Sequence, residues 1–186
     1  YHLVTAAEPK FEQALRKWIY LLRGEDKDIK VDHPDKQGEM DIFAVRQDYQ
    51  NDIIKSIVVE LKHPLIKLGK PELDQVDKYL DVIFKQPEFN GSNMYWEFYL
   101  IGNSLDTTGY IERQYKMAEV YGEKSLVFKN PRYKTYVKMW SEVFNDFELR
   151  HKFLNDKLGI ERDKLLGEHN NAGDIISNQD KNTAAQ

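Results

Sequence analysis

Two charged residues near the end of an apolar segment are the part of this sequence best suited to do chemistry. The stretch "VVELKHP", residues 58–64, places Glu60 and Lys62 among Val and Leu residues. Alternate side chains of a β-strand point to opposite faces, so Glu60 and Lys62 share one face. A carboxylate can hold a cation, and an ammonium can orient a water or stabilise negative charge. The pair is therefore either a surface ion pair or half of an active site.

A second carboxylate is predicted to lie opposite the first. Segments 40–47 and 53–64 are typical of two strands, and the polar stretch between them predicts an antiparallel hairpin centred between Gln50 and Asn51. Cross-strand partners in a symmetrical hairpin have a constant sum of residue numbers, and Asp41 with Glu60 gives the sum of Gln50 with Asn51. We expect Asp41 to face Glu60 unless a bulge shifts the register. Taken alone, Asp41 is more simply a residue of a turn or of a strand start.

A helix is predicted over residues 69–87, directly after the strand that carries Glu60. Gly69 precedes it, Pro71 suits its first turn, and its apolar residues recur at helical spacing. Gln75 and Tyr79, four residues apart, lie together at the margin of the apolar stripe. They are either partners of the charged pair or ordinary residues at the edge of the apolar stripe, with the Tyr79 hydroxyl exposed to solvent.

The joint spacing of Asp41, Glu60-x-Lys62 and Gln75-xxx-Tyr79 resembles the PD-(D/E)xK nuclease superfamily, although Met40 stands where that motif has proline. The resemblance covers roughly residues 5–140. The wording "VVELKHP…ELDQVDKYLDVI" is most similar to the nuclease domain of the Shedu family of bacterial anti-phage proteins. The fold that the resemblance implies is α/β (α+β), with a restriction-endonuclease-like core: a central mixed sheet flanked by helices in the order αβββαβ.

The resemblance also implies an activity, namely a DNA endonuclease that depends on Mg²⁺ or Mn²⁺ and serves as the effector of a larger defence protein. Asp41, Glu60 and the backbone carbonyl of Leu61 would hold the metal ion. Lys62 would act on the attacking water or the phosphate, supported by Gln75 and Tyr79. On this basis we expect Lys62→Ala to abolish cleavage while leaving the fold intact, as for a charge at a strand end.

The first predicted helix supplies a further metal ligand by the same resemblance. Residues 5–23 show helical spacing of apolar residues and end at Gly24, with Thr5 and Glu8 as a capping box. Related nucleases often add a Glu from this helix, and Glu12 is the candidate here. Taken alone, Glu12 is a solvated helix carboxylate.

Basic and aromatic residues alternate in "KNPRYKTYVK", residues 129–138. Lys129, Arg132 and Lys134 are candidates for contact with a nucleic-acid backbone, but an exposed strand has the same composition about as often. Two further function classes stay open. One is a nuclease-like domain that no longer cuts and instead binds nucleic acid or assembles its parent protein, and the other is a nuclease that acts on RNA.

The sequence predicts a single nuclease-like domain with a C-terminal helical extension over residues 1–166 and a flexible tail over 167–186. Residues 94–103, 125–130 and 133–140 are typical of strands, and residues 110–120 of a helix. Residues 141–159 predict a long amphipathic helix that ends at Gly159, whose apolar face could serve a partner, a second copy included. We identify no internal repeat and no heptad series.

Composition limits the remaining choices. The 186 residues include no cysteine, which excludes disulfides and thiolate zinc sites, and the five histidines show no paired metal spacing. A net charge of -4 excludes a uniformly basic nucleic-acid-binding body. No apolar run reaches the ~18 residues of a membrane span, so we expect no membrane contact. The absence of cysteine fits a reducing compartment, and we expect a cytoplasmic protein. Because the chain begins with Tyr1, we expect other domains in a longer parent chain.

Overall fold

The computed structural model describes residues 2–5, 10–24, 41–48 and 51–168. The chain divides into two compact units, Tyr1–Trp140 and Ser141–Gln186. Residues 28–38, "DIKVDHPDKQG", are typical of a short strand followed by a turn, but they lie outside the described residues. The same holds for all but the first two residues of the expected tail. Each unit is considered by itself below.

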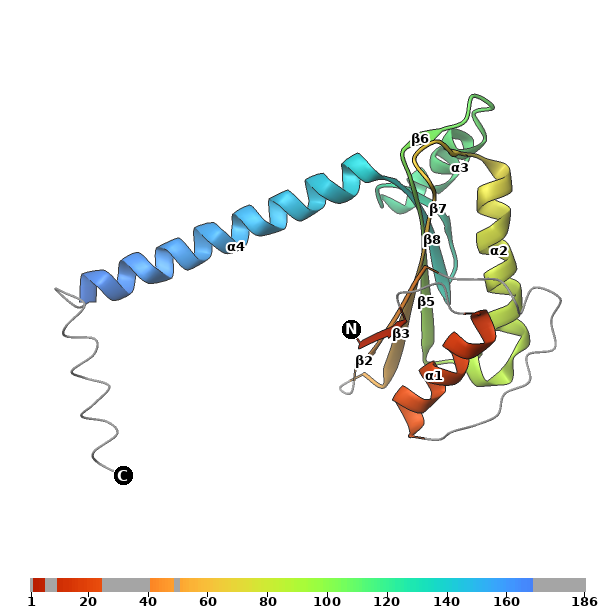
Figure 1. Cartoon of the computed structure of the whole chain (residues 1–186), viewed down its shortest axis with the longest axis horizontal. Helices are drawn as coiled ribbons and strands as arrows, with labels where there is room; N and C mark the ends of the chain where they lie inside the picture. Colours follow the sequence, from red (N-terminus) through yellow and green to blue (C-terminus); the bar gives the residue numbers. More distant parts are fainter. Residues whose placement is uncertain (1, 6–9, 25–40, 49–50, 169–186) are drawn as a thin grey trace. The chain divides into compact units, whose positions relative to one another are not determined.

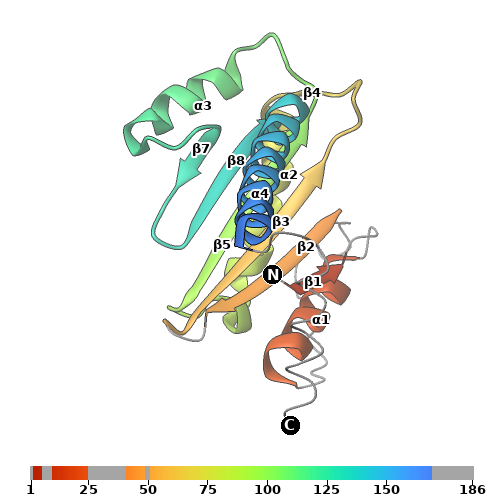
Figure 2. The same cartoon turned by 90° about the vertical axis from the view of Figure 1, so that its left-hand side faces the viewer.

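A six-stranded mixed sheet forms the centre of the first unit (Figures 1 and 2). Its order is β1-β2-β3-β5-β8-β7; β3, β5 and β8 are parallel to one another, and the remaining neighbours are antiparallel. A separate parallel pair, β4 with β6, lies beside the start of the second helix. The strands are β1 His2–Thr5, β2 Ile42–Asp48, β3 Ile53–Leu61, β4 Lys67–Leu68, β5 Met94–Gly102, β6 Ser104–Leu105, β7 Leu126–Lys129 and β8 Tyr133–Met139. The mixed α+β class expected from the sequence is confirmed.

The register of the β2–β3 hairpin is the one predicted. Ile42 pairs with Val59 and Asp48 with Ile53, which gives the constant sum expected for a turn centred between Gln50 and Asn51. No bulge interrupts this pairing, so Asp41, one residue before β2, lies opposite Glu60.

The helices of the first unit are α1 Phe11–Arg23, α2 Lys70–Lys85 and α3 Tyr110–Ala118, with short 3₁₀ turns at Pro87–Phe89 and Glu119–Tyr121. Helices α1 and α2 cover the same face of the sheet (Figure 1). The core between them and the sheet is aromatic: Trp96 of β5 stacks on Trp18 at 5.9 Å and on Phe43 at 5.8 Å between ring centroids. Burial of these large rings contributes most of the driving force for this packing.

The predicted start of the first helix is wrong. Thr5 was expected as its N-cap, but Thr5 is the last residue of β1 and pairs with Phe43, and the helix begins at Phe11. Sheet pairing with β2 outweighs the local capping preference because it satisfies backbone groups along the edge of the sheet. The predicted end is confirmed: Gly24 adopts the left-handed conformation, and its N–H donates to the carbonyl of Tyr20.

Helix α4, Trp140–Glu168, accounts for the described part of the second unit. The prediction that it ends at Gly159 is wrong, because the helix continues through this glycine. A glycine inside a helix costs only about 1 kcal/mol, which the flanking helix formers offset. None of the described helices, α4 included, is both long and apolar enough to cross a membrane.

One buried hydrogen bond ties α1 to the sheet and gives a test of this packing. The Nε1–H of fully buried Trp18 donates to Ser56 Oγ at 2.8 Å. Ser56→Ala would leave the indole N–H buried without this partner, and we expect a loss of about 1–3 kcal/mol in the free energy of unfolding. Urea denaturation checks this value. Ser92→Ala, at an exposed position, is the control and should change stability by under about 0.5 kcal/mol; equal effects of the two substitutions would contradict the assignment.

Candidate functional site

The candidate site lies where the end of β3 meets the middle of α2. Ser56, Val58 and Glu60 alternate along β3 and are buried, so Glu60 shares the face that α1 and α2 cover. A short connection from His63 through β4 leads directly into α2. There the N–H of Gly69 donates to the Glu72 carboxylate at 2.9 Å, which fixes the first turn of the helix.

The Glu60 carboxylate accepts three hydrogen bonds from three side chains. Oε1 accepts from Lys62 Nζ at 2.8 Å and from Gln75 Nε2 at 2.8 Å. Oε2 accepts from the Tyr79 hydroxyl at 2.9 Å. One donor, Lys62, directly follows β3, and the other two come from α2, so the Glu60 carboxylate joins the end of the strand to the helix.

Gln75 closes the network. Its Oε1 accepts from Lys62 Nζ at 2.5 Å, while its Nε2 donates to both Glu60 and the Tyr79 hydroxyl, the latter at 3.1 Å. The two ends of one amide therefore hold the cation and the anion at once. We call Glu60, Lys62, Gln75 and Tyr79 the Glu60 network.

The charged pair within this network is largely removed from solvent. The side chains of Lys62 and Glu60 are only 13% and 8% exposed. A surface ion pair, the alternative left open by the sequence, does not describe this arrangement. The expectation that Lys62→Ala leaves the fold intact assumed an exposed charge at a strand end, and the burial of Lys62 contradicts that premise. Removing one partner of a buried pair leaves the other charge buried without a counter-ion.

Tyr79 is held in its protonated form. Burial raises the pKa of its hydroxyl well above the ordinary value, and the negative charge of Glu60 raises it further. A phenol that stays protonated at all ordinary pH values remains a hydrogen-bond donor to Glu60. Tyr79 is buried and its hydroxyl donates to Glu60, which excludes the solvent-exposed hydroxyl considered from the sequence.

Asp41 reaches the same end of the sheet from β2. Its Oδ2 accepts a hydrogen bond from the Leu61 N–H at 2.5 Å. Its charge also contributes to the raised pKa of the Tyr79 hydroxyl, which places this carboxylate within electrostatic reach of the Glu60 network. Unlike Glu60, Asp41 is only half-buried.

The oxygen donors at this end of the sheet are of the type that a hard divalent cation takes as ligands. Asp41 and Glu60 supply two carboxylates, and the described residues contain no cluster of three His, Cys, Asp or Glu. Two carboxylates suit Mg²⁺, which retains several of its waters, and would be too few for a zinc site. The Leu61 carbonyl follows Glu60 in the chain. Glu12 lies in α1, and its side chain is outside the described part of the structure.

The three basic residues proposed for nucleic-acid contact do not form one patch. Lys129 and Lys134 both donate to Glu123, each at 2.8 Å. Arg132 instead lies over the Phe84 ring of α2, with 4.9 Å from its guanidinium carbon to the ring centroid. Two of the three cations are thus neutralised by the same carboxylate.

Glu123 was missed by sequence reasoning, although it organises three neighbours. Besides the two lysines, Tyr136 donates its hydroxyl to Glu123 at 2.6 Å. These hydrogen bonds, first those from Lys129 and Lys134, lower the pKa of Glu123 to about 2. Glu123 stands in a loop between α3 and β7, where no periodic pattern marks a residue as important.

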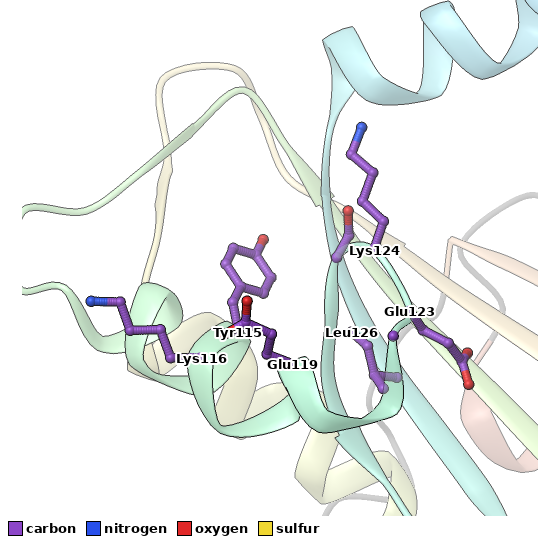
Figure 3. A pocket seen from close by; sticks show the side chains of 8 residues that line it. Tyr115, Lys116, Glu119, Glu123, Lys124 and Leu126 are labelled. Carbon is purple, nitrogen blue, oxygen red and sulfur yellow. The ribbon is translucent and has the colours of Figure 1, made fainter.

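An open hollow of about 540 Å³ lies between α3 and β7. Tyr115, Glu119 and Leu126 are among its lining residues, and Figure 3 shows the Lys116 and Glu123 side chains directed away from each other. None of the residues of the Glu60 network lines it. The hollow therefore adds no group to the candidate site.

Comparison of the chain with family models, with curated proteins and with solved structures finds no match.

The buried ion pair predicts an unequal response to two lysine substitutions. Lys62→Ala should lower the free energy of unfolding by roughly 3–5 kcal/mol, because Glu60 stays buried without its cation. Lys85→Ala is the matched control: Lys85 contacts Asp81 at 2.7 Å, but both side chains are more than half exposed. That control should cost under about 0.5 kcal/mol. Chemical denaturation of both variants checks the difference, and similar losses would contradict the burial of the Lys62 pair.

The Glu123 cluster predicts an acid-dependent loss of stability. A folded-state pKa near 2, below that of the unfolded chain, means that Glu123 stabilises the fold above about pH 4.5 and loses this effect as the pH falls towards 2. Glu123→Gln should therefore be less stable than the wild type at pH 7, and the gap should narrow between pH 5 and pH 2. Thermal unfolding at each pH measures the gap. A gap independent of pH would show that the charge of Glu123 is not what stabilises the cluster.

Proposed function

We propose that the unit Tyr1–Trp140 is a metal-dependent nuclease domain of the PD-(D/E)xK type, which hydrolyses phosphodiester bonds in DNA. Its sheet would then be the superfamily's restriction-endonuclease-like core, and the wording around Glu60 and Tyr79 points to an effector domain like that of Shedu anti-phage proteins. The observation that carries the proposal is the convergence of Asp41 with the Glu60 network at one end of the sheet. Five residues that matched the motif by spacing alone lie together in space.

Each residue of the candidate site would have a separate role in phosphodiester hydrolysis. Asp41 and Glu60 would hold a Mg²⁺ or Mn²⁺ ion, with the Leu61 carbonyl as a third donor. The bound ion supplies charge neutralisation at the scissile phosphate and a lowered pKa for the attacking water. Lys62 orients that water or stabilises the negative charge that builds on the phosphate.

Gln75 and Tyr79 act as positioning residues in this scheme. Gln75 holds Lys62 Nζ at 2.5 Å and Glu60 Oε1 at 2.8 Å, so cation and carboxylate keep a fixed separation. Tyr79 keeps the second carboxylate oxygen oriented because its hydroxyl stays protonated. Prearranged charges of this kind avoid reorganisation during the reaction.

A second candidate is a nuclease-like domain that does not cut. It is favoured by the completeness of the Glu60 network, in which Lys62 already balances the carboxylate without any added cation. In the nuclease, a divalent cation must compete with or join this pair. In the silent domain, the network serves stability alone. Metal binding therefore separates the two candidates.

Cleavage of plasmid and linear DNA with Mg²⁺ or Mn²⁺, beside an EDTA control, tests the proposal. Asp41→Asn is the decisive variant, because its side-chain oxygen can still accept from the Leu61 N–H while the carboxylate charge is lost. We expect metal-dependent cutting by the wild type and a loss of at least about 100-fold in Asp41→Asn, with unfolding free energy changed by under about 1 kcal/mol. Asp74→Asn, an exposed carboxylate of α2 paired with Lys70, is the matched control and should cut normally.

Thermal unfolding with and without Mn²⁺ gives a second readout. A cation held by Asp41 and Glu60 should raise the unfolding temperature of the wild type, and Asp41→Asn should remove that rise. Stabilisation by Mn²⁺ without DNA cleavage would indicate that the substrate is RNA or another phosphodiester. Absence of both cleavage and stabilisation would contradict the nuclease and favour the silent domain.

A further inference from the structure

Helix α4 exposes a large apolar surface for one helix. Among its described side chains, seven large apolar ones are more than half exposed: Phe144, Phe147, Leu149, Phe153, Leu154, Leu158 and Ile160. Single exposed apolar residues are ordinary, but this many on the helix that accounts for the described part of the second unit indicates a contact surface.

These residues fall on two nearly opposite sides of α4. Phe144, Phe147, Leu154 and Leu158 lie on one side, while Leu149, Phe153 and Ile160 lie on the other, as the rotation of about 100° per residue requires. Because the two rows lie on opposite sides, their hydrophobic contributions nearly cancel when they are summed around the helix axis. The amphipathic helix predicted from the sequence is thus an oversimplification, because α4 has two apolar faces.

The first row continues as a regular series. Steps of four and three residues alternate from Trp140 through Phe144, Phe147, His151, Leu154, Leu158 and Glu161 to Leu165. The rings of Phe147 and His151 lie 4.1 Å apart between centroids, which places these two on one stripe. A repeat of 3.5 residues is the spacing that keeps a stripe facing a partner helix in a coiled coil. The sequence prediction that the chain has no heptad series is therefore wrong for this helix. We call this row the α4 seam.

We propose that α4 joins two copies of this chain by pairing their seams as a two-stranded coiled coil. A second copy presents the same stripe with the same repeat, and a twofold contact needs no other partner. This inference is independent of the proposed nuclease activity and concerns a different unit of the chain.

The seam is long enough to form a dimer interface of ordinary size. Phe144 and Phe147 from two chains would bury on the order of 600 Å², and the two pairs of Leu154 and Leu158 add to this. A stable interface requires roughly 1,200 Å² in total, which the 29 residues of α4 are long enough to provide. Two polar seam residues, His151 and Glu161, weaken the pairing and fix its register. The dimer should therefore dissociate on dilution.

Light scattering on the full chain after size exclusion, over a series of protein concentrations, measures the assembly. We expect twice the chain mass of 22.0 kDa at high concentration and a shift towards the monomer on dilution. Phe147→Lys with Leu154→Lys places four like charges in the paired seam and should give monomers throughout. Leu149→Lys with Phe153→Lys, on the opposite face, adds the same charge and removes similar apolar area, and should still dimerise.

Each outcome decides the proposal. A monomeric wild type, a dimer that survives the seam substitutions, or a dimer lost equally in both variants would overturn it. The unfolding transition of the first unit is followed in every sample, because its sheet shares no residue with the substitutions and should be unchanged. Mass and stability together thus separate loss of pairing from loss of folding.

Discussion

The buried carboxylate of Glu60 is the interaction on which the arrangement of this domain depends. Removing a charged carboxylate from water costs several kcal/mol unless its hydrogen-bonding capacity is met. Lys62 supplies the opposite charge from the position directly after β3, while Gln75 and Tyr79 must come from α2. The position of α2 on the sheet is therefore constrained by chemistry as well as by apolar packing, since a shift of one helical turn would leave Glu60 without two of its donors.

The opposite face of the sheet also carries carboxylates that contact lysine and tyrosine side chains. Glu97 alternates with Trp96 and Phe98 on β5, so it points away from the aromatic core. On that opposite face Lys55 Nζ contacts the Glu97 carboxylate at 2.7 Å, and the Tyr99 hydroxyl donates to it at 3.0 Å. Glu123 likewise holds two lysines and a tyrosine at the edge formed by β7 and β8. Carboxylates surrounded by lysine and tyrosine thus connect neighbouring strands on a face that α1 and α2 leave uncovered.

Local periodicity and turn position allowed much of this to be predicted from the sequence. The hairpin register placed Asp41 opposite Glu60 because a symmetrical turn leaves no freedom once its centre is known. The start of α1 was missed, since pairing of Thr5 with Phe43 is a long-range event that local capping cannot reveal. The seam of α4 was missed because His151 and Glu161 interrupt it and a second apolar row lies opposite. Burial of Lys62 depends on α2 covering β3, and one strand's pattern does not contain that information.

In this site the residues proposed for chemistry are also those that hold the fold, and this decides how function can be assigned. A substitution at Glu60 or Lys62 removes a partner from a buried pair, so a loss of activity there would mix catalysis with unfolding. Asp41 is different, because it is half-buried and its structural hydrogen bond goes to a backbone N–H that a neutral amide can also satisfy. Of the two carboxylates, therefore, only Asp41 allows the effect of losing the charge to be measured apart from a loss of stability. The proposed chemistry is therefore best tested at Asp41, which lies beside the Glu60 network, rather than at the residues of the network itself.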